Sequence, residues 1–229
     1  AFDSPRLLGH DPERGMTLWS YLAGRSLDEL ASSRSPEVLQ AAAAAGEAVK
    51  ALHTGPIPSG LPARDGAAEA AWVEVWVERL AALAPFLGGQ ARVTLPRVRE
   101  RLARSAEPAA LVHADLHDRQ VMLDGGRVGI LDWDTVAVGE PALDLANLLV
   151  HMEVRAMLGG RRAADAGPAG AAVMTGYGAA HPGRIVDYAA AIRLRVACQY
   201  RFRPPAAHIC DLLINRLTEP PAGLVGSRG

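Results

Sequence analysis

The chain has 229 residues, of which 49% are hydrophobic and 21% charged, a composition typical of a globular protein with a full core. Its 24 basic and 25 acidic residues give a formal charge of −1, which argues against nucleic acid or an anionic membrane as a partner. Arg, Glu or Gly interrupts every apolar run before it reaches the length of a membrane span, and no charged-then-apolar leader opens the chain. The two cysteines, Cys198 and Cys210, make no disulfide framework, so we expect reduced, buried thiols in a cytoplasmic protein.

The N-terminal residues predict a β-hairpin followed by a capped helix. Pro5–Leu8 and Met16–Leu22 are strand-like runs around a polar turn, and Ala23-Gly24 ends them. Ser26 and Glu29 have the spacing of a capping box, which predicts a short helix directly afterwards.

Proline and glycine divide the middle of the chain into further helices. A helix is expected from Pro36 to His53, because Thr54-Gly55-Pro56 follows it. Apolar residues at helical spacing predict another over Gly66–Leu83, and a third is expected from Pro96 to about Ser105.

The predicted secondary structure then changes from helix to short strands and back to helix. Ala110–Val112 is a brief apolar run, and Val121–Leu123 and Arg127–Leu131 flank an Asp-Gly-Gly turn that is typical of a hairpin. After Pro141 we expect helices over 141–158, 165–180, 183–203 and 207–217.

The loop and hairpin of residues 113–134 carry the chemistry. Asp115 lies in the middle of the loop, Gln120 at the start of the first strand, and Asp132 at the end of the returning strand. Two carboxylates and an amide so placed meet the needs of phosphoryl transfer, which uses a carboxylate to orient the attacking hydroxyl and oxygen ligands that hold magnesium on the nucleotide phosphates. Because a hairpin folds its two ends together, Gln120 and Asp132 are expected side by side on one cation, whose identity this geometry leaves open.

Five segments carry a family pattern, and in chain order they are Leu22–Leu27, Ala51–His53, His113-Ala-Asp115, Leu131-Asp132-Trp133-Asp134 and Gly139–Ala146. In this order they resemble the aminoglycoside phosphotransferases and related choline kinase-like enzymes. The resemblance implies an α+β, protein-kinase-like fold that is mainly a helical C-terminal lobe with a short catalytic hairpin. Residues 1–23 would be the last hairpin of the nucleotide lobe and the hinge, and 24–229 the catalytic and substrate-binding lobe.

The resemblance also implies an activity and its central residues. The activity is the transfer of a phosphoryl group from ATP or GTP, assisted by Mg²⁺, to a hydroxyl of a small molecule such as an aminoglycoside-like antibiotic or another metabolite. Asp115 would be the catalytic base, with Asp132 as the principal metal ligand and Gln120 as a second one. His113 would hold the loop through hydrogen bonds, and Asp134 would support the site.

The same resemblance assigns residues to the nucleotide. The backbone of Ser20, Tyr21 and Leu22 would meet the edge of the adenine ring, and Met122 and Leu131 would form an apolar floor beneath it. Asp144 would anchor the loop to the following helix.

Two departures from the family pattern leave alternatives open. The metal-binding Asn of the family is Gln120 here, which keeps the amide oxygen but moves it outward by one methylene. No Gly-rich loop and no strand lysine precede the hinge, and Lys50 lies in a helix after it. We expect that N-terminal residues are missing, and the alternative is a truncated relative that binds without turnover.

A third alternative is a metal-dependent hydrolase that uses His113, Asp115 and His117, although this leaves the Asp-Trp-Asp at 132–134 unexplained. For the remaining polar residues we expect simpler roles. His117, Asp118 and Arg119 are expected to face solvent from the loop. Solvated surface is likewise expected for Arg193, Arg195, Arg201 and Arg203. Trp72 and Trp76 are expected to pack against core or helix, while an acidic acceptor pocket for a polycation could draw on Glu69, Glu74 and Glu78.

Overall fold

The computed structural model describes residues 1–104, 107–203 and 206–224. The strands within these ranges are β1 Leu7–Asp11, β2 Met16–Trp19, β3 Arg25–Ser26, β4 Ala63–Arg64, β5 Ala110–Val112, β6 Val121–Asp124, β7 Arg127–Ile130 and β8 Ala137–Gly139. The helices are α1 Leu27–Ser32, α2 Val38–His53, α3 Gly66–Leu83, α4 Pro85–Leu102, α5 Pro141–Leu158, α6 Gly167–Tyr177, α7 Pro182–Tyr200 and α8 Cys210–Asn215, with 3-10 turns η1 Ala163–Ala166 and η2 Ala206–Ile209.

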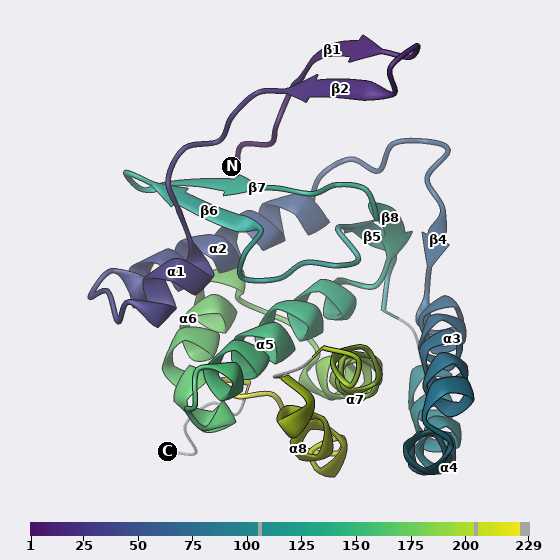
Figure 1. The fold of residues 1–229 in the computed structure, drawn as a ribbon. Helices are drawn as coiled ribbons and strands as arrows, with labels where there is room; N and C mark the ends of the chain where they lie inside the picture. The colour runs from purple at the N-terminus through teal and green to yellow at the C-terminus, as the bar shows by residue number, and fades with distance from the viewer. Residues whose placement is uncertain (105–106, 204–205, 225–229) are drawn as a thin grey trace.

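The N-terminal hairpin β1–β2 stands away from the rest of the molecule (Figure 1). Its antiparallel register pairs Asp11 with Met16 around the polar turn that the sequence predicts. Apolar side chains on both strands are exposed, among them Leu18 at 62% and Trp19 at 52%. The division of the chain into two lobes at residue 23 remains a prediction.

The predicted catalytic hairpin is present and joins a three-stranded sheet. β6 and β7 pair antiparallel with Val121 opposite Ile130, and β3 adds to the free edge of β6. Gly125 and Gly126 both have positive φ at the turn, which an Asp-Gly-Gly sequence allows without strain. A second sheet, in the order β4-β8-β5, was not predicted because β4 and β8 are only two and three residues long.

The helices gather on one side of β6–β7, with α3 and α4 side by side at the edge of the molecule (Figure 1). The capping box is formed, since Ser26 accepts from the Glu29 amide and Glu29 accepts from the Ser26 amide. α3 has the predicted bounds and is capped by Asp65. Three later helices follow the expected segments closely. α5 has the expected bounds of 141–158, α6 spans 167–177 where 165–180 was expected, and α7 spans 182–200 where 183–203 was expected.

The expected start of a helix at Pro96 is wrong, because α4 begins eleven residues earlier, at Pro85. Pro85 occupies the first turn of the helix, where a missing N–H costs nothing, and Pro96 is carried inside the helix. The predicted end of this helix, at about Ser105, lies outside the described residues.

The expectation that Arg193 and Arg195 are solvated is also wrong, since their exposures are 0% and 5%. Both side chains lie on the inner side of α7, which packs on α5. Arg193 makes a buried ion pair with Glu153 of α5 at 2.8 Å and donates from Nη1 to the carbonyl oxygens of Arg216 and Glu219. The pair thus joins α5, α7 and the C-terminal segment.

We expect Arg193→Met to lower the free energy of unfolding by about 3–5 kcal/mol, because the Glu153 carboxylate would stay buried without its main partner. Urea denaturation followed by circular dichroism measures this. The double variant Arg193→Met/Glu153→Met should recover most of the loss, whereas Arg162→Met, at an exposed ion pair with Asp165, should change little. A loss no larger than that of Arg162→Met would show that the buried pair does not hold these elements together.

Candidate active site

The loop of residues 113–119, called the catalytic loop below, is held at its start by the first turn of α5. The Asp144 carboxylate is fully buried and accepts from the backbone amides of His113 and Ala114 at 2.7 and 2.8 Å. Asn147, one turn further along, donates to the carbonyl oxygen of Ala114 at 3.3 Å. His53, at the end of α2, contacts the same Asp144 carboxylate at 3.1 Å. Asp144 therefore anchors both the loop and α2, in agreement with its predicted role.

The rest of the catalytic loop follows α5 for two further turns. The ring of His151 lies 5.3 Å from that of His117, and the Nε atom of Arg155 lies 3.9 Å from Oδ1 of Asp118. Asn147, His151 and Arg155 are spaced four apart, so they lie on one face of the helix. These three residues form a polar stripe on α5, and the catalytic loop runs along this stripe.

His113 ties the loop to the end of the hairpin. Its Nε2 atom lies 2.8 Å from the carbonyl oxygen of Leu131, and its own carbonyl oxygen accepts from Thr135 Oγ1 at 2.8 Å. Ala114 and Asp132, on either side of this connection, both have left-handed backbones with φ of 68° and 65°. Non-glycine residues in this region cost free energy and cluster at functional sites. The strain here lies at Asp132 itself and at the residue before Asp115.

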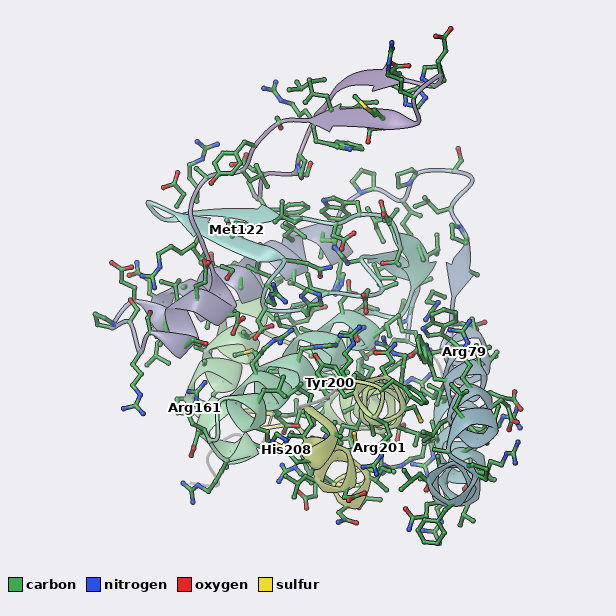
Figure 2. The ribbon with its side chains drawn as sticks, viewed as in Figure 1. Arg79, Met122, Arg161, Tyr200, Arg201 and His208 are labelled. Atoms are coloured by element: carbon green, nitrogen blue, oxygen red, sulfur yellow. The ribbon has the colours of Figure 1, made fainter. Side chains whose placement is uncertain are left out.

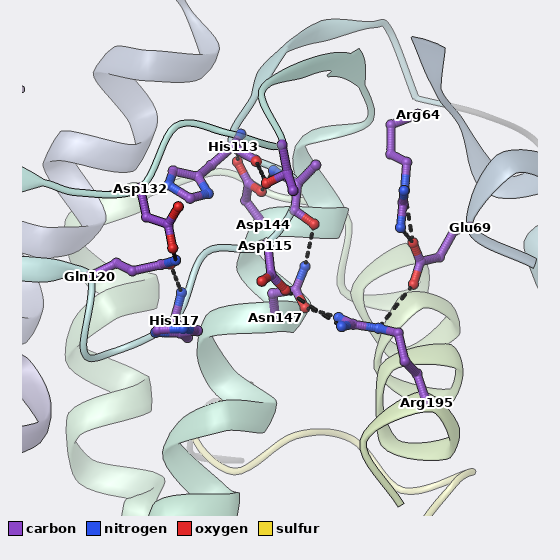
Figure 3. A network of polar contacts seen from close by, with 12 residues as sticks. Arg64, Glu69, His113, Asp115, His117, Gln120, Asp132, Asp144, Asn147 and Arg195 are labelled. Carbon is purple, nitrogen blue, oxygen red and sulfur yellow. Dashed lines mark hydrogen bonds and ion pairs between the residues drawn. The ribbon is translucent and has the colours of Figure 1, made fainter. Parts of the chain in front are cut away.

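Gln120 and Asp132 are adjacent, as the hairpin predicts. The Gln120 Nε2 atom donates to Asp132 Oδ2 at 3.1 Å, and its Oε1 atom accepts from the His117 amide at 3.0 Å (Figure 3). Gln120 is buried and Asp132 is exposed. In this arrangement the amide oxygen points at the loop backbone, so a turn of the terminal amide is needed before it can face a cation at Asp132.

Asp115 projects from the loop with 41% of its side chain exposed and is accompanied by a buried arginine. Arg195 Nη1 lies 3.5 Å from Asp115 Oδ1, and Arg195 Nη2 donates to Asn147 Oδ1 at 2.8 Å. On its other side Arg195 faces Glu69, whose carboxylate also accepts from Arg64 at 2.7 Å (Figure 3). This network connects Asp115 to α3, and sequence reasoning missed it because Arg195 looked like a surface residue.

Three of the predicted nucleotide residues line one cavity of about 180 Å³. Tyr21 and Leu22, from the segment between β2 and β3, and Met122 of β6 are among its lining residues, and Met122 is labelled in Figure 2. Ser20 lies next to this segment, where its Oγ atom accepts from the Arg6 amide and its own amide donates to the Arg6 carbonyl oxygen. Leu131 lies at the end of β7, beside Gln120, and is not among the residues that line this cavity.

The acids of α3 are paired rather than free. Glu69 is fully buried between Arg64 and Arg195, while Glu74 and Glu78 make ion pairs with Arg99 and Arg92 of α4. Trp72 and Trp76 lie edge to face, 6.2 Å apart, and are 38% exposed and half-buried, respectively. The acidic wall that would receive a polycation is therefore largely neutralised by arginines.

Asp134, which was predicted to support the site, is exposed.

The predicted solvent exposure of the 117–119 segment holds for Arg119 alone. Asp118 is only 2% exposed, and burial raises the pKa of its carboxyl to about 7. Burial lowers the pKa of the His117 imidazole. It lowers the pKa of His151, which is more deeply buried, well below its usual value. Both imidazoles are therefore neutral at physiological pH and act as packing groups between loop and helix.

The hydrolase alternative finds no support in the arrangement of ligands. Within the described ranges, no three His, Cys, Asp or Glu side chains are grouped so as to hold a metal ion. His113 is fully buried and turned toward Leu131. His113, Asp115 and His117 therefore do not converge on a zinc site.

A family model described as “Phosphotransferase enzyme family” matches residues 2–182. The chain belongs to the phosphotransferase enzyme family. This confirms the family and the enzyme class predicted from the motifs, a phosphotransferase with an alcohol group as acceptor. The match covers the catalytic loop, the hairpin and α5, while Arg193 and Arg195 lie beyond it.

Solved structures of other phosphotransferases share the fold. A choline/ethanolamine kinase family protein from Mesorhizobium loti is 22% identical, with a TM-score of 0.67 over 94% of this chain and 77% of that one. The GDP complex of aminoglycoside 2'-phosphotransferase-IIIa is 17% identical, with a TM-score of 0.64 over 95% of this chain and 76% of that one. An aminoglycoside phosphotransferase from Streptomyces rimosus, in complex with ADP and streptomycin, is 22% identical, with a TM-score of 0.61 over 85% of this chain and 76% of that one.

At these identities the likeness establishes the protein-kinase-like fold, which confirms the predicted fold class. A comparison with curated protein sequences gives no match. No helix in the described part of this phosphotransferase-family chain is both long and apolar enough to cross a membrane.

Proposed function

We propose that the protein is a cytoplasmic, Mg²⁺-assisted phosphotransferase that moves the γ-phosphoryl group of ATP or GTP to a hydroxyl of a small molecule. The observation that carries this is the arrangement of the anchored catalytic loop, which leaves the Asp115 side chain partly exposed, while Gln120 at the end of the loop is hydrogen-bonded to Asp132. In this proposal Asp115 orients the acceptor hydroxyl and accepts its proton.

Asp132 and Gln120 are the groups that would hold the cation. Mg²⁺ is typically bound through one or two protein oxygen ligands, with water and substrate phosphates completing its shell. One exposed carboxylate beside one amide fits that pattern. Bound there, Mg²⁺ would neutralise charge that develops on the transferred phosphoryl group.

The nucleotide is proposed to lie between the hinge and the hairpin. Tyr21, Leu22 and Met122 line a common cavity there, which supports their assignment to the adenine ring. Ser20 is proposed to contribute only through its backbone, and Leu131 to approach the base from the end of β7.

For the acceptor, we favour a small hydroxylated metabolite over a polycationic aminoglycoside. The α3 carboxylates that a polycation would need are paired with Arg64, Arg92, Arg99 and Arg195. Each such arginine would have to be displaced before an amine could take its place, at a cost in binding free energy.

Phosphate transfer from ATP and GTP to a panel of amino alcohols, sugars and aminoglycosides tests the proposal. We expect Mg²⁺-dependent transfer to at least one amino alcohol or sugar, and weaker transfer to aminoglycosides. Nucleotide binding without transfer to any acceptor would favour the alternative of a protein that binds without turnover.

The Gln120 side chain is tested by a graded series. Gln120→Asn keeps the amide and is expected to hold kcat within about tenfold, or roughly 1.4 kcal/mol in barrier. Gln120→Glu keeps the oxygen and should retain Mg²⁺-dependent turnover, whereas Gln120→Leu, which loses both polar contacts, should lose far more. Wild-type activity in Gln120→Leu would exclude the side chain from the metal site.

A further inference from the structure

Arg195 of α7 is a buried cation that makes no short contact with a carboxylate within the described ranges. Its side chain is 7% exposed, and the one contact of its guanidinium below 3 Å goes to the neutral amide oxygen of Asn147, at 2.8 Å. A buried charge is costly unless nearby groups of opposite charge compensate it. Two carboxylates lie within 4 Å, that of Glu69 at 3.6 Å and that of Asp115 at 3.5 Å.

Glu69 alone does not account for this arginine. Its Oε2 atom already accepts from Nε and Nη2 of Arg64, at 3.0 and 2.7 Å. Its Oε1 atom and Nε of Arg195 face each other at 3.6 Å, and both lack a hydrogen-bond partner in the described part of the chain. Arg64 thus balances the charge of Glu69. The charge of Arg195 then needs a second carboxylate, and the one within reach is that of Asp115.

The guanidinium of Arg195 is placed by two helices outside its own. Nη2 donates to Asn147 of α5, and Nε faces Glu69 of α3, which directs Nη1 toward Asp115 (Figure 3). Asn147 also donates to the carbonyl oxygen of Ala114, the residue before Asp115. Because a guanidinium is planar and rigid, fixing two of its nitrogens fixes the third. The position of Nη1 is therefore set relative to the backbone of the catalytic loop.

The contact reaches one oxygen of the Asp115 carboxylate. Nη1 lies 3.5 Å from Oδ1, the length of an ion pair rather than of a short hydrogen bond, and burial of the arginine strengthens the attraction. Among the residues that the structure describes, Arg195 is the one whose side chain pairs with that of Asp115. With 41% of the Asp115 side chain exposed, Oδ2 remains available to a group outside the protein.

We propose that Arg195 is a positioning residue for phosphoryl transfer, which holds Asp115 by Oδ1 so that Oδ2 faces the acceptor hydroxyl. Glu69 is the counter-charge that keeps the guanidinium in place. The inference rests on the proposed role of Asp115 as the base, and Arg195 acts only through that carboxylate. A catalytic group displaced by about 1 Å can cost roughly 10²-fold in rate, so such a hold matters for turnover.

The rotamer of Asp115 tests the hold and needs no acceptor. Three-bond couplings between Hα and Hβ, measured by NMR on the labelled full chain, report its χ1 angle. We expect one dominant rotamer in the wild type and rotamer averaging in Arg195→Met, because the carboxylate loses its partner. Arg195→Lys keeps a charge beside Glu69 but not the planar fork, so it should fold and show averaging as well.

The matched control is the double variant Arg193→Met/Glu153→Met, which removes another buried arginine of α7 together with its carboxylate. It should keep the Asp115 rotamer of the wild type, since neither residue contacts the catalytic loop in the described structure. A single rotamer in both Arg195 variants, or averaging already in the wild type, would overturn the proposal.

Turnover is measured on the acceptor that the wild type phosphorylates fastest. We expect Arg195→Met to lower kcat roughly 10- to 100-fold with the KM for nucleotide nearly unchanged. Adding it to Asp115→Asn should cost nothing further, because both changes remove the same positioned carboxylate. Additive losses, or wild-type kcat in Arg195→Met, would overturn this inference alone. Wild-type kcat in Asp115→Asn would overturn the proposed role of Asp115 and the inference with it.

Discussion

Replacing Asp115 with asparagine is expected to lower kcat by about 10²- to 10⁴-fold and to leave nucleotide affinity nearly unchanged. The size is that of a typical general-base contribution. Asparagine keeps the shape of the side chain, so the new amide would still face Arg195, but an amide is a poor proton acceptor. Because Asp115 is separate from the Asp132–Gln120 pair, binding of the Mg²⁺–nucleotide complex should persist.

Phosphate transfer to a confirmed acceptor, followed directly, measures the loss, and calorimetry measures nucleotide affinity. Asp211→Asn is the matched control, since it makes the same exchange at an exposed position on α8. Turnover of Asp115→Asn at the wild-type rate would remove Asp115 from the role of base. A parallel loss of nucleotide affinity would instead place it at the nucleotide or its metal.

Replacing Asp132 with alanine is expected to abolish Mg²⁺-dependent nucleotide binding. Asp132 is the only carboxylate in the proposed ligand set, and its removal would leave the Gln120 amide alone. A neutral amide by itself holds Mg²⁺ poorly, since the ion prefers carboxylate and phosphate oxygens. The expected outcome in a calorimetric titration with ATP or GTP is loss of the Mg²⁺-dependent heat.

Asp134→Ala, at an exposed carboxylate two residues away, is the natural comparison because it removes the same charge from the same loop. It should retain most of the binding. If Asp132→Ala bound the nucleotide as the wild type does, Asp132 would have no place in the metal site. Loss in both variants would indicate a general effect of negative charge in this loop.

The hairpin and its partners were predictable because their signals are local. An Asp-Gly-Gly turn between apolar runs fixes the register that sets Gln120 beside Asp132, and a capping box fixes the start of α1. The family motifs lie in the same stretch. The turn and the family motifs therefore predicted that Gln120 and Asp132 lie side by side.

The orientation of side chains did not follow from them. Gln120 points its oxygen at the His117 amide, and this depends on a loop conformation set by contacts with α5. Arg195 and Asp118 were expected at the surface because both are charged, yet each is buried by packing of segments far apart in the sequence. A charge pattern in one segment carries no information about the partner that another segment supplies.

The stripe on α5 constrains how the chain can change length. A single residue inserted into α5 after Asp144 would turn everything beyond it by about 100°, because an α-helix has 3.6 residues per turn. Asp144 would still accept from the His113 and Ala114 amides, but Asn147, His151 and Arg155 would leave the loop together. Insertions and deletions are therefore excluded between Asp144 and Arg155 unless the catalytic loop changes with them, whereas substitutions on the opposite face of α5 leave the alignment of loop and helix intact.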